Sequence, residues 1–132
     1  MSKKPVATLV QEAAKTDTPI IRLVDLIIES GLHDGANQIH LWPIDDGRLE
    51  VQHQKDGKFT AVDYVPSELA RHVIARLKIA ANCSIQTKTQ AQYSRAKTWK
   101  PMGPPRPKRI RTYELFVIPT ERGEGAVIQI IC

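Results

Sequence analysis

Two stretches of the chain repeat hydrophobic residues at intervals of three and four, which is the spacing of an amphipathic helix. The first covers residues 20–32, begins after Pro19 and ends near Gly35. The second follows Pro66 and continues through residue 81, and its polar side is expected to carry Arg71, Arg76 and Lys78. The pattern predicts two helices, each with an apolar side that needs a partner layer.

Shorter stretches have the character of strands, and the first two of them alternate apolar and polar residues. Three of them lie between the predicted helices, at 38–42, 49–53 and 59–64, and two close the chain, at 113–118 and 126–131. Asp-Gly turns separate the first three, and such a turn is the strongest local sign of a hairpin. The last stretch is apolar except for Gln129, so it is expected to be a strand buried on both faces.

The order helix, three strands, helix, two strands predicts an α+β fold, an antiparallel sheet of about five strands with two main helices packed against it. A chain of 132 residues suffices for one domain, which we expect to span residues 18–131. Residues 1–17 are polar and are expected to form a flexible segment. Residues 84–110 hold four of the nine prolines without a clear period, which predicts a basic, proline-rich loop.

Positive charge is concentrated in one part of the chain. The whole sequence has a net charge of +5, yet residues 86–113 carry eight basic side chains and no acidic one. The rest of the chain is therefore net acidic. The candidate anion-binding or partner-binding residues of this segment are Lys97, Lys100, Arg106, Lys108, Arg109 and Arg111.

Three roles are open for the basic segment. Tyr93 and Trp99 lie among its charges, an arrangement that suits nucleic-acid binding by residues 88–111. The same charges would suit anionic lipid headgroups. We favour a solvated loop, or one that docks on an acidic partner protein.

Other chemistry-bearing residues indicate no catalytic, cofactor or metal site. Four histidines lie on different predicted elements, so no metal centre is expected: His33, His40, His53 and His72. Cys83 is expected to be a small buried hydrophobic residue and Cys132 an exposed residue at the chain end. The less favoured alternative is that a cysteine forms a catalytic pair with a histidine. Trp42 is expected to pack in the core or at an edge, and the alternative is an anchor for a partner.

Several motifs resemble those of a known family in their order and spacing. They are Thr18-Pro-Ile-Ile-Arg-Leu-Val-Asp-Leu-Ile-Ile, Gly35-Ala-Asn-Gln-Ile-His-Leu-Trp-Pro, Lys55-Asp-Gly, Ala75-Arg-Leu-Lys-Ile-Ala-Ala, Ile118-Pro-Thr and Gly123-Glu. Over roughly residues 18–131 the chain resembles the second N-terminal domain of the assembly ATPases of type II secretion and type IV pili. The resemblance implies a PAS-like domain, which in the family precedes a RecA-like motor, and protein partners in secretion or pilus machinery.

The resemblance also identifies positions where this chain departs from the family. Family arginines fall here on Glu50, Gln52, Gln54, Glu114 and Gln129. Arginines of this domain help the family to contact nucleotide, and Glu or Gln cannot offer a phosphate a fixed positive charge. The sequence contains no Gly-x-x-x-x-Gly-Lys-Ser/Thr loop for phosphates, so no enzymatic activity is expected.

The sequence therefore predicts a non-catalytic protein-interaction or regulatory domain without a cofactor, and nucleic-acid binding is the alternative. No apolar run approaches the roughly 20 residues of a membrane-spanning helix. The N-terminus lacks the apolar stretch of a signal peptide. We expect a cytoplasmic protein, peripheral to the inner membrane through its partners, that is either free-standing or a piece of a longer protein.

Overall fold

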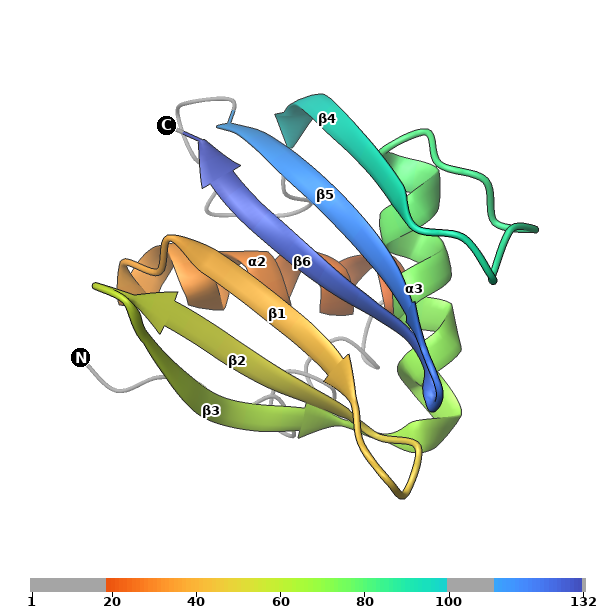
Figure 1. Cartoon of the computed structure of the whole chain (residues 1–132). Coiled ribbons are helices and arrows are strands. Elements are labelled where there is room, and N and C mark those ends of the chain that lie inside the picture. Colours follow the sequence, from red (N-terminus) through yellow and green to blue (C-terminus); the bar gives the residue numbers. More distant parts are fainter. Residues whose placement is uncertain (1–18, 100–110, 132) are drawn as a thin grey trace.

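A computed structural model describes residues 19–99 and 111–131 of the chain. These residues form an antiparallel sheet of six strands and two helices (Figure 1). The elements in chain order are α2 (Pro19–Asp34), β1 (Gln38–Pro43), β2 (Leu49–Lys55), β3 (Lys58–Val65), α3 (Ser67–Ala80), β4 (Gln92–Trp99), β5 (Arg111–Thr120) and β6 (Gly123–Ile131). The predicted α+β fold is confirmed and is consistent with a PAS-like arrangement.

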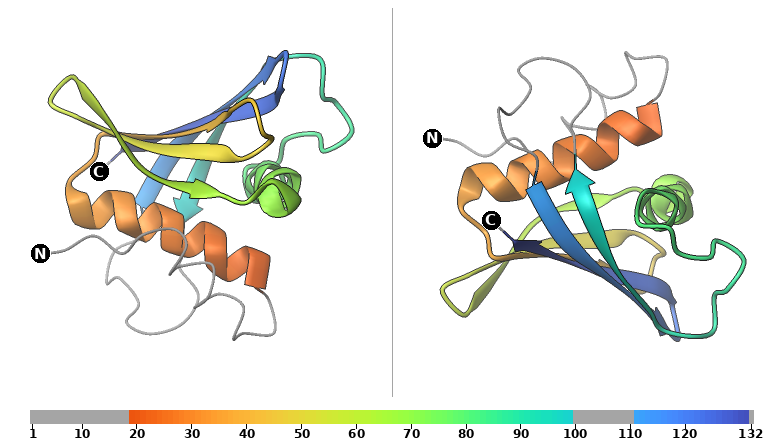
Figure 2. Two further views of the ribbon diagram at one scale, coloured as in Figure 1. Left: turned by 90° about the horizontal axis from the view of Figure 1, so that it is seen from below. Right: turned by 90° about the horizontal axis from the view of Figure 1, so that it is seen from above.

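The chain fills the sheet from its centre to one edge and then from the other edge back to the centre. The strand order is β3-β2-β1-β6-β5-β4, so the first and last strands are neighbours. Helix α3 connects the edge strand β3 to the opposite edge strand β4. Both helices lie against the same face of the curved sheet (Figure 2). Among the described residues no helix covers the other face, which we call the open face.

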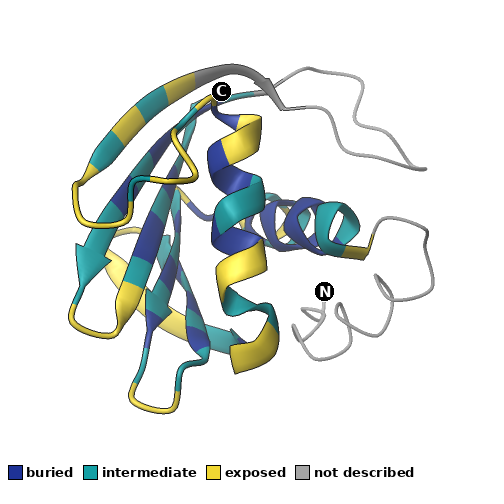
Figure 3. Cartoon of the chain, turned by 90° about the vertical axis from the view of Figure 1, so that its right-hand side faces the viewer, coloured by how far each residue is buried: buried dark blue, intermediate teal, exposed yellow. Residues whose placement is uncertain are grey.

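The core lies between the helices and the covered face of the sheet (Figure 3). Burial of one such apolar side chain contributes about 1.5–3 kcal/mol, so this layer is the main source of stability. The alternation predicted for the first strand is confirmed, because Ile39 and Leu41 are fully buried while His40 and Trp42 are only half-buried. Fully buried side chains come from both helices and from five strands: Leu23, Ile27, Ile39, Leu41, Val51, Val65, Val73, Leu77, Leu115 and Ile128.

The turn between β2 and β3 has the backbone conformation for which an Asp-Gly pair is suited. It consists of two residues, Asp56 and Gly57, whose φ angles are 52° and 79°. A two-residue hairpin turn with positive φ at both positions matches the twist of the flanking strands, and Asp-Gly is a preferred pair for it. The hairpin predicted at this position is confirmed.

The sheet contains a sixth strand that the sequence prediction missed. Strand β4 lies within residues 84–110, which were interpreted as a loop, and it pairs with β5 along the sheet edge. The prolines of that segment all follow β4 in the sequence, so they do not interrupt it. An edge strand also needs few apolar side chains. At the inward position Ser94, a hydroxyl donates a hydrogen bond to the Ala81 carbonyl at 2.5 Å.

The expectation that the last strand is buried on both faces is wrong. On β6, Ala126 and Ile128 are fully buried under the helices, whereas Val127 and Gln129 are half-buried on the open face. The reason is that both helices lie on the same side of the sheet. The expected flexible segment 1–17 and the proline-rich part of the expected loop lie outside the described residues.

Candidate functional site

The open face gathers the positions where the sequence departs from the family pattern. The strand register sets Gln54 opposite Gln38, Gln38 opposite Gln129, and Gln129 opposite Glu114, so one row crosses β2, β1, β6 and β5. All five positions 50, 52, 54, 114 and 129 are glutamine or glutamate residues on inner strands of the sheet, and they come together only through this strand order. We call this series the amide row.

Hydrogen bonds between neighbouring side chains hold the open face in place. His40 bonds to the Gln38 side-chain oxygen at 2.9 Å. On β2, the Gln52 amide donates to the Glu50 carboxylate at 2.6 Å. The Tyr93 hydroxyl on β4 donates to the Glu114 carboxylate. The two glutamates of the open face therefore already accept bonds from neighbours, and the surface they form is polar.

Beside the amide row lies a shallow apolar hollow of about 400 Å³. The ring of His40 meets the ring of Phe59 edge-on, with 4.8 Å between the ring centroids. Burial lowers the pKa of His40 below its usual value near 6.5, so at neutral pH the imidazole carries no charge. The hollow is lined by His40, Trp42, Gln52, Phe59, Ile118 and Val127.

Trp42 packs across the open face over the backbone of β6. A Cβ atom on Gly125 would lie 2.6 Å from Cε3 of the Trp42 ring, so the glycine makes room for the indole. The ring is half-buried, and its remaining surface lines the hollow. Trp42 is thus a packing residue that also shapes the candidate site.

Replacing Gly125 by alanine is expected to push the indole out of this position. The clash is expected to cost about 1–3 kcal/mol of the free energy of unfolding. In a Trp99→Phe background, where Trp42 is the one remaining tryptophan, the fluorescence emission of Gly125→Ala is expected to move to longer wavelength. Unchanged emission and unchanged urea unfolding would show that the ring does not depend on the glycine.

The predicted anion-binding residues fall largely outside the described part of the chain. Lys97 lies on β4 and Arg111 on β5, two strands that pair with each other. The structure does not describe where the others lie: Lys100, Arg106, Lys108 and Arg109. Their joint role in binding stays a prediction.

The histidines and the described cysteine take separate places. His53 is buried and its Nδ1 lies 2.9 Å from the Asp34 carboxylate, whereas His33 and His72 are exposed on different helices. Within residues 19–99 and 111–131, no three His, Cys, Asp or Glu side chains are placed to hold a metal ion. Burial raises the pKa of the Cys83 thiol, which disfavours the reactive thiolate. Cys132 lies outside the described residues.

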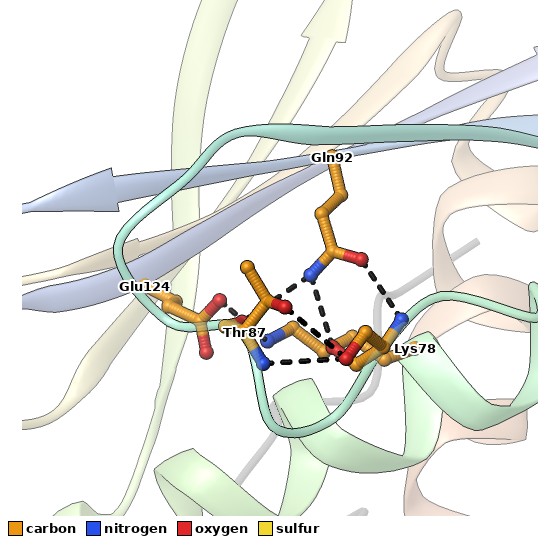
Figure 4. Close-up of polar contacts among 5 residues, drawn as sticks. Lys78, Thr87, Gln92 and Glu124 are labelled. Carbon is orange, nitrogen blue, oxygen red and sulfur yellow. Dashed lines mark hydrogen bonds and ion pairs between the residues drawn. The ribbon is translucent and has the colours of Figure 1, made fainter.

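Sequence reasoning placed Lys78 wrongly on the polar side of its helix. The side chain is 1% exposed, and its Nζ lies 2.5 Å from the Glu124 carboxylate and 2.8 Å from the Thr87 carbonyl oxygen (Figure 4). The Gln92 side chain also bonds to the Thr87 carbonyl, at 3.3 Å, and to both backbone groups of Ser84. This Lys78 network joins α3, the loop before β4 and the β5–β6 hairpin.

The fold and the open face define a PAS-like α+β domain whose polar sheet surface is hollowed by apolar side chains. The chain belongs to the family of Type II/IV secretion system proteins, whose pattern matches residues 13–131. Neither helix in the described part of the chain is long and apolar enough to cross a membrane.

Individual relatives agree with this assignment. The type IV pilus assembly ATPase TfpB of Acinetobacter baylyi is 32% identical over 120 residues, which is 91% of this chain and 20% of the relative. The type II secretion system protein E of Xanthomonas campestris is 30% identical over 88% of this chain and 19% of its own length. The type IV pilus assembly ATPase PilB of Pseudomonas aeruginosa is 28% identical over 90% of this chain and 20% of its own length. The chain thus spans about a fifth of these relatives and corresponds to an N-terminal domain alone.

Proposed function

We propose that the chain is a non-catalytic interaction domain of a type II secretion or type IV pilus machinery, and that it works in the cytoplasm through protein contacts at the inner membrane. The observation that carries this proposal is the open face, where glutamine and glutamate stand at the positions of the family's arginines and Gln54, Gln129 and Glu114 of these belong to the amide row. Amides and an apolar hollow suit contacts with protein surfaces, which combine an apolar centre with a polar rim. They offer no fixed positive charge to a phosphate.

The proposal predicts that a machinery component contacts the open face. Phe59 is 54% exposed beside the hollow and accepts a photo-crosslinking phenylalanine derivative with little change in shape. Irradiation of the bacterium that encodes the chain is expected to link position 59 to a secretion or pilus component. His33 is exposed on α2, outside the hollow, and is the control position. If position 59 links to no such component while the machinery is assembled, the proposal fails.

The purified chain is also expected to release no phosphate from ATP above the background of a heat-denatured sample. ATP is expected to leave the backbone amide resonances of the open-face strands unshifted, since the positions 50, 52, 54, 114 and 129 carry no cation. Phosphate release that grows with chain concentration would contradict the absence of catalysis.

Nucleic-acid binding by residues 88–111 remains the competing prediction from sequence. It requires binding whose affinity falls steeply with rising salt, because each neutralised phosphate releases counterions. Titration of labelled single- and double-stranded DNA at low and moderate salt separates the two functions. Our proposal expects no saturable binding even at low salt.

A further inference from the structure

A pair of neighbouring hollows lies on the other side of the molecule from the amide row, between α3 and the β5–β6 hairpin. They measure about 220 and 480 Å³, and Arg71, Gly123 and Glu124 belong to the walls of both. We call the two together the α3–hairpin groove. Cavities of this size accommodate several side chains of a bound segment.

Positive charge dominates the rim of the α3–hairpin groove. Arg71 and Lys88 are exposed, and the described part of the chain provides neither with a hydrogen-bond or ion-pair partner. Arg122 pairs with Asp45 at 2.5 Å, but both side chains are more than half exposed, so this pair contributes little and exchanges readily. Glu124, the acidic member of the walls, is already neutralised by buried Lys78. A ligand of the groove therefore meets an excess of unpaired cations.

The accessible apolar surface of the groove lies in the larger hollow, which narrows the class of ligand. Ile85, which is 48% exposed, lines the larger hollow, whereas Leu49 and Ile74 in the wall of the smaller hollow are buried. Neither hollow has a Trp, Tyr or Phe side chain in its wall, so a single-stranded nucleic acid would find the imidazole of His72 as the one ring there on which to stack its bases. Carboxylates together with aliphatic side chains match this surface better than a phosphate backbone does.

The groove is also formed before any ligand arrives. The Lys78 network fixes the hairpin through Glu124 and the loop before β4 through the Thr87 carbonyl. Gln92 adds bonds to Ser84 in the same loop (Figure 4). A surface that is already ordered loses little conformational entropy on binding.

We infer that the α3–hairpin groove docks an acidic segment of a partner protein, with carboxylates on Arg71 and Lys88 and aliphatic side chains in the larger hollow. This inference rests on the proposed function, since it specifies a second surface and a kind of partner for the same interaction domain.

The test uses the full chain labelled with ¹⁵N and a peptide of about eight residues that alternates Glu and Leu, long enough to cross both hollows. Titration is expected to shift the amide resonances of Ala75, Ile85 and Gly123, which line the groove, in a saturable way. The double change Arg71→Glu and Lys88→Glu is expected to weaken binding at least about tenfold. Arg71→Gln with Lys88→Gln tests the same loss with a gentler change if the reversal impairs folding.

A control carries the same change in net charge at another place. Lys55→Glu with Lys58→Glu alters the two residues that flank the β2–β3 turn, and neither of them lines the groove. This variant is expected to leave the affinity within about twofold, because exposed charges outside a binding site are largely screened by salt. Equal weakening by the control and by the groove variant would overturn the inference, since it would show a general charge effect.

The chemistry of the probe gives the remaining outcomes. A peptide with Gln in place of Glu is expected not to bind, and binding of equal strength would overturn the inference. The inference would also be overturned if single-stranded DNA shifted the amide resonances of the groove and the acidic peptide did not. If the acidic peptide leaves the groove resonances unshifted while position 59 still links to a machinery component, the groove inference fails and the proposed function stands.

Discussion

Replacing Lys78 by methionine is expected to lower the free energy of unfolding by roughly 3–5 kcal/mol, the cost of removing one partner of a buried ion pair. The substitution leaves the Glu124 carboxylate, which is 13% exposed, without its counter-charge. It also removes the donor that the ammonium group offers to the Thr87 carbonyl. Urea unfolding followed by circular dichroism measures the loss, provided that the slope of the transition is unchanged.

A double-mutant cycle shows whether the loss comes from the isolated charge. Lys78→Met together with Glu124→Leu removes both charges and is expected to recover most of the stability, because an apolar pair often replaces a buried ion pair without net cost. Arg71→Met is the matched control on the exposed side of α3 and is expected to change the free energy of unfolding by less than about 0.5 kcal/mol. Costs that simply add in the double variant would mean that the two side chains are not coupled.

The burial of Lys78 could have been predicted in part from the sequence. Ile74, Leu77, Lys78 and Ala81 follow the spacing of a buried helical stripe, and all four are buried. Periodicity alone would therefore have placed Lys78 inside. A lysine is almost never fully buried without a partner, and the counter-charge of Lys78, Glu124, lies far along the chain on another element.

The hydrophobic pattern predicted the helices and the strands that contribute to the core, because those elements bury a regular face. It could not predict strand β4, whose edge position demands little apolar surface, or the order of the strands. The amide row depends on that order, since Gln38 and Gln129 meet only where β1 and β6 are neighbours. The resemblance identified the individual positions, and only the sheet brings them onto one surface.

The contact between α2 and β1 depends on a glycine, which leads to the second large effect. Gly31 lies in the buried part of α2, and a Cβ atom there would come within 2.3 Å of Cδ1 and 2.6 Å of Cγ1 of Ile39. Ile39 is 0% exposed, so its side chain has no free space into which it can move. Gly31→Ala is expected to cost about 1–3 kcal/mol through overpacking, even though alanine favours a helix over glycine by about 1 kcal/mol.

A smaller residue at position 39 is expected to turn Gly31→Ala from a destabilising into a stabilising substitution. Ile39→Ala alone costs about 2–5 kcal/mol, because it leaves a cavity under α2. In that background the new methyl group of Gly31→Ala meets empty space, so the substitution is expected to stabilise the chain by about 1 kcal/mol through helix propensity. Ile39→Val keeps the Cγ1 branch, and there Gly31→Ala is expected to remain destabilising. Urea unfolding of the five variants measures the cycle, and stabilisation of the otherwise unchanged chain by Gly31→Ala would show that helix and strand are not packed this closely.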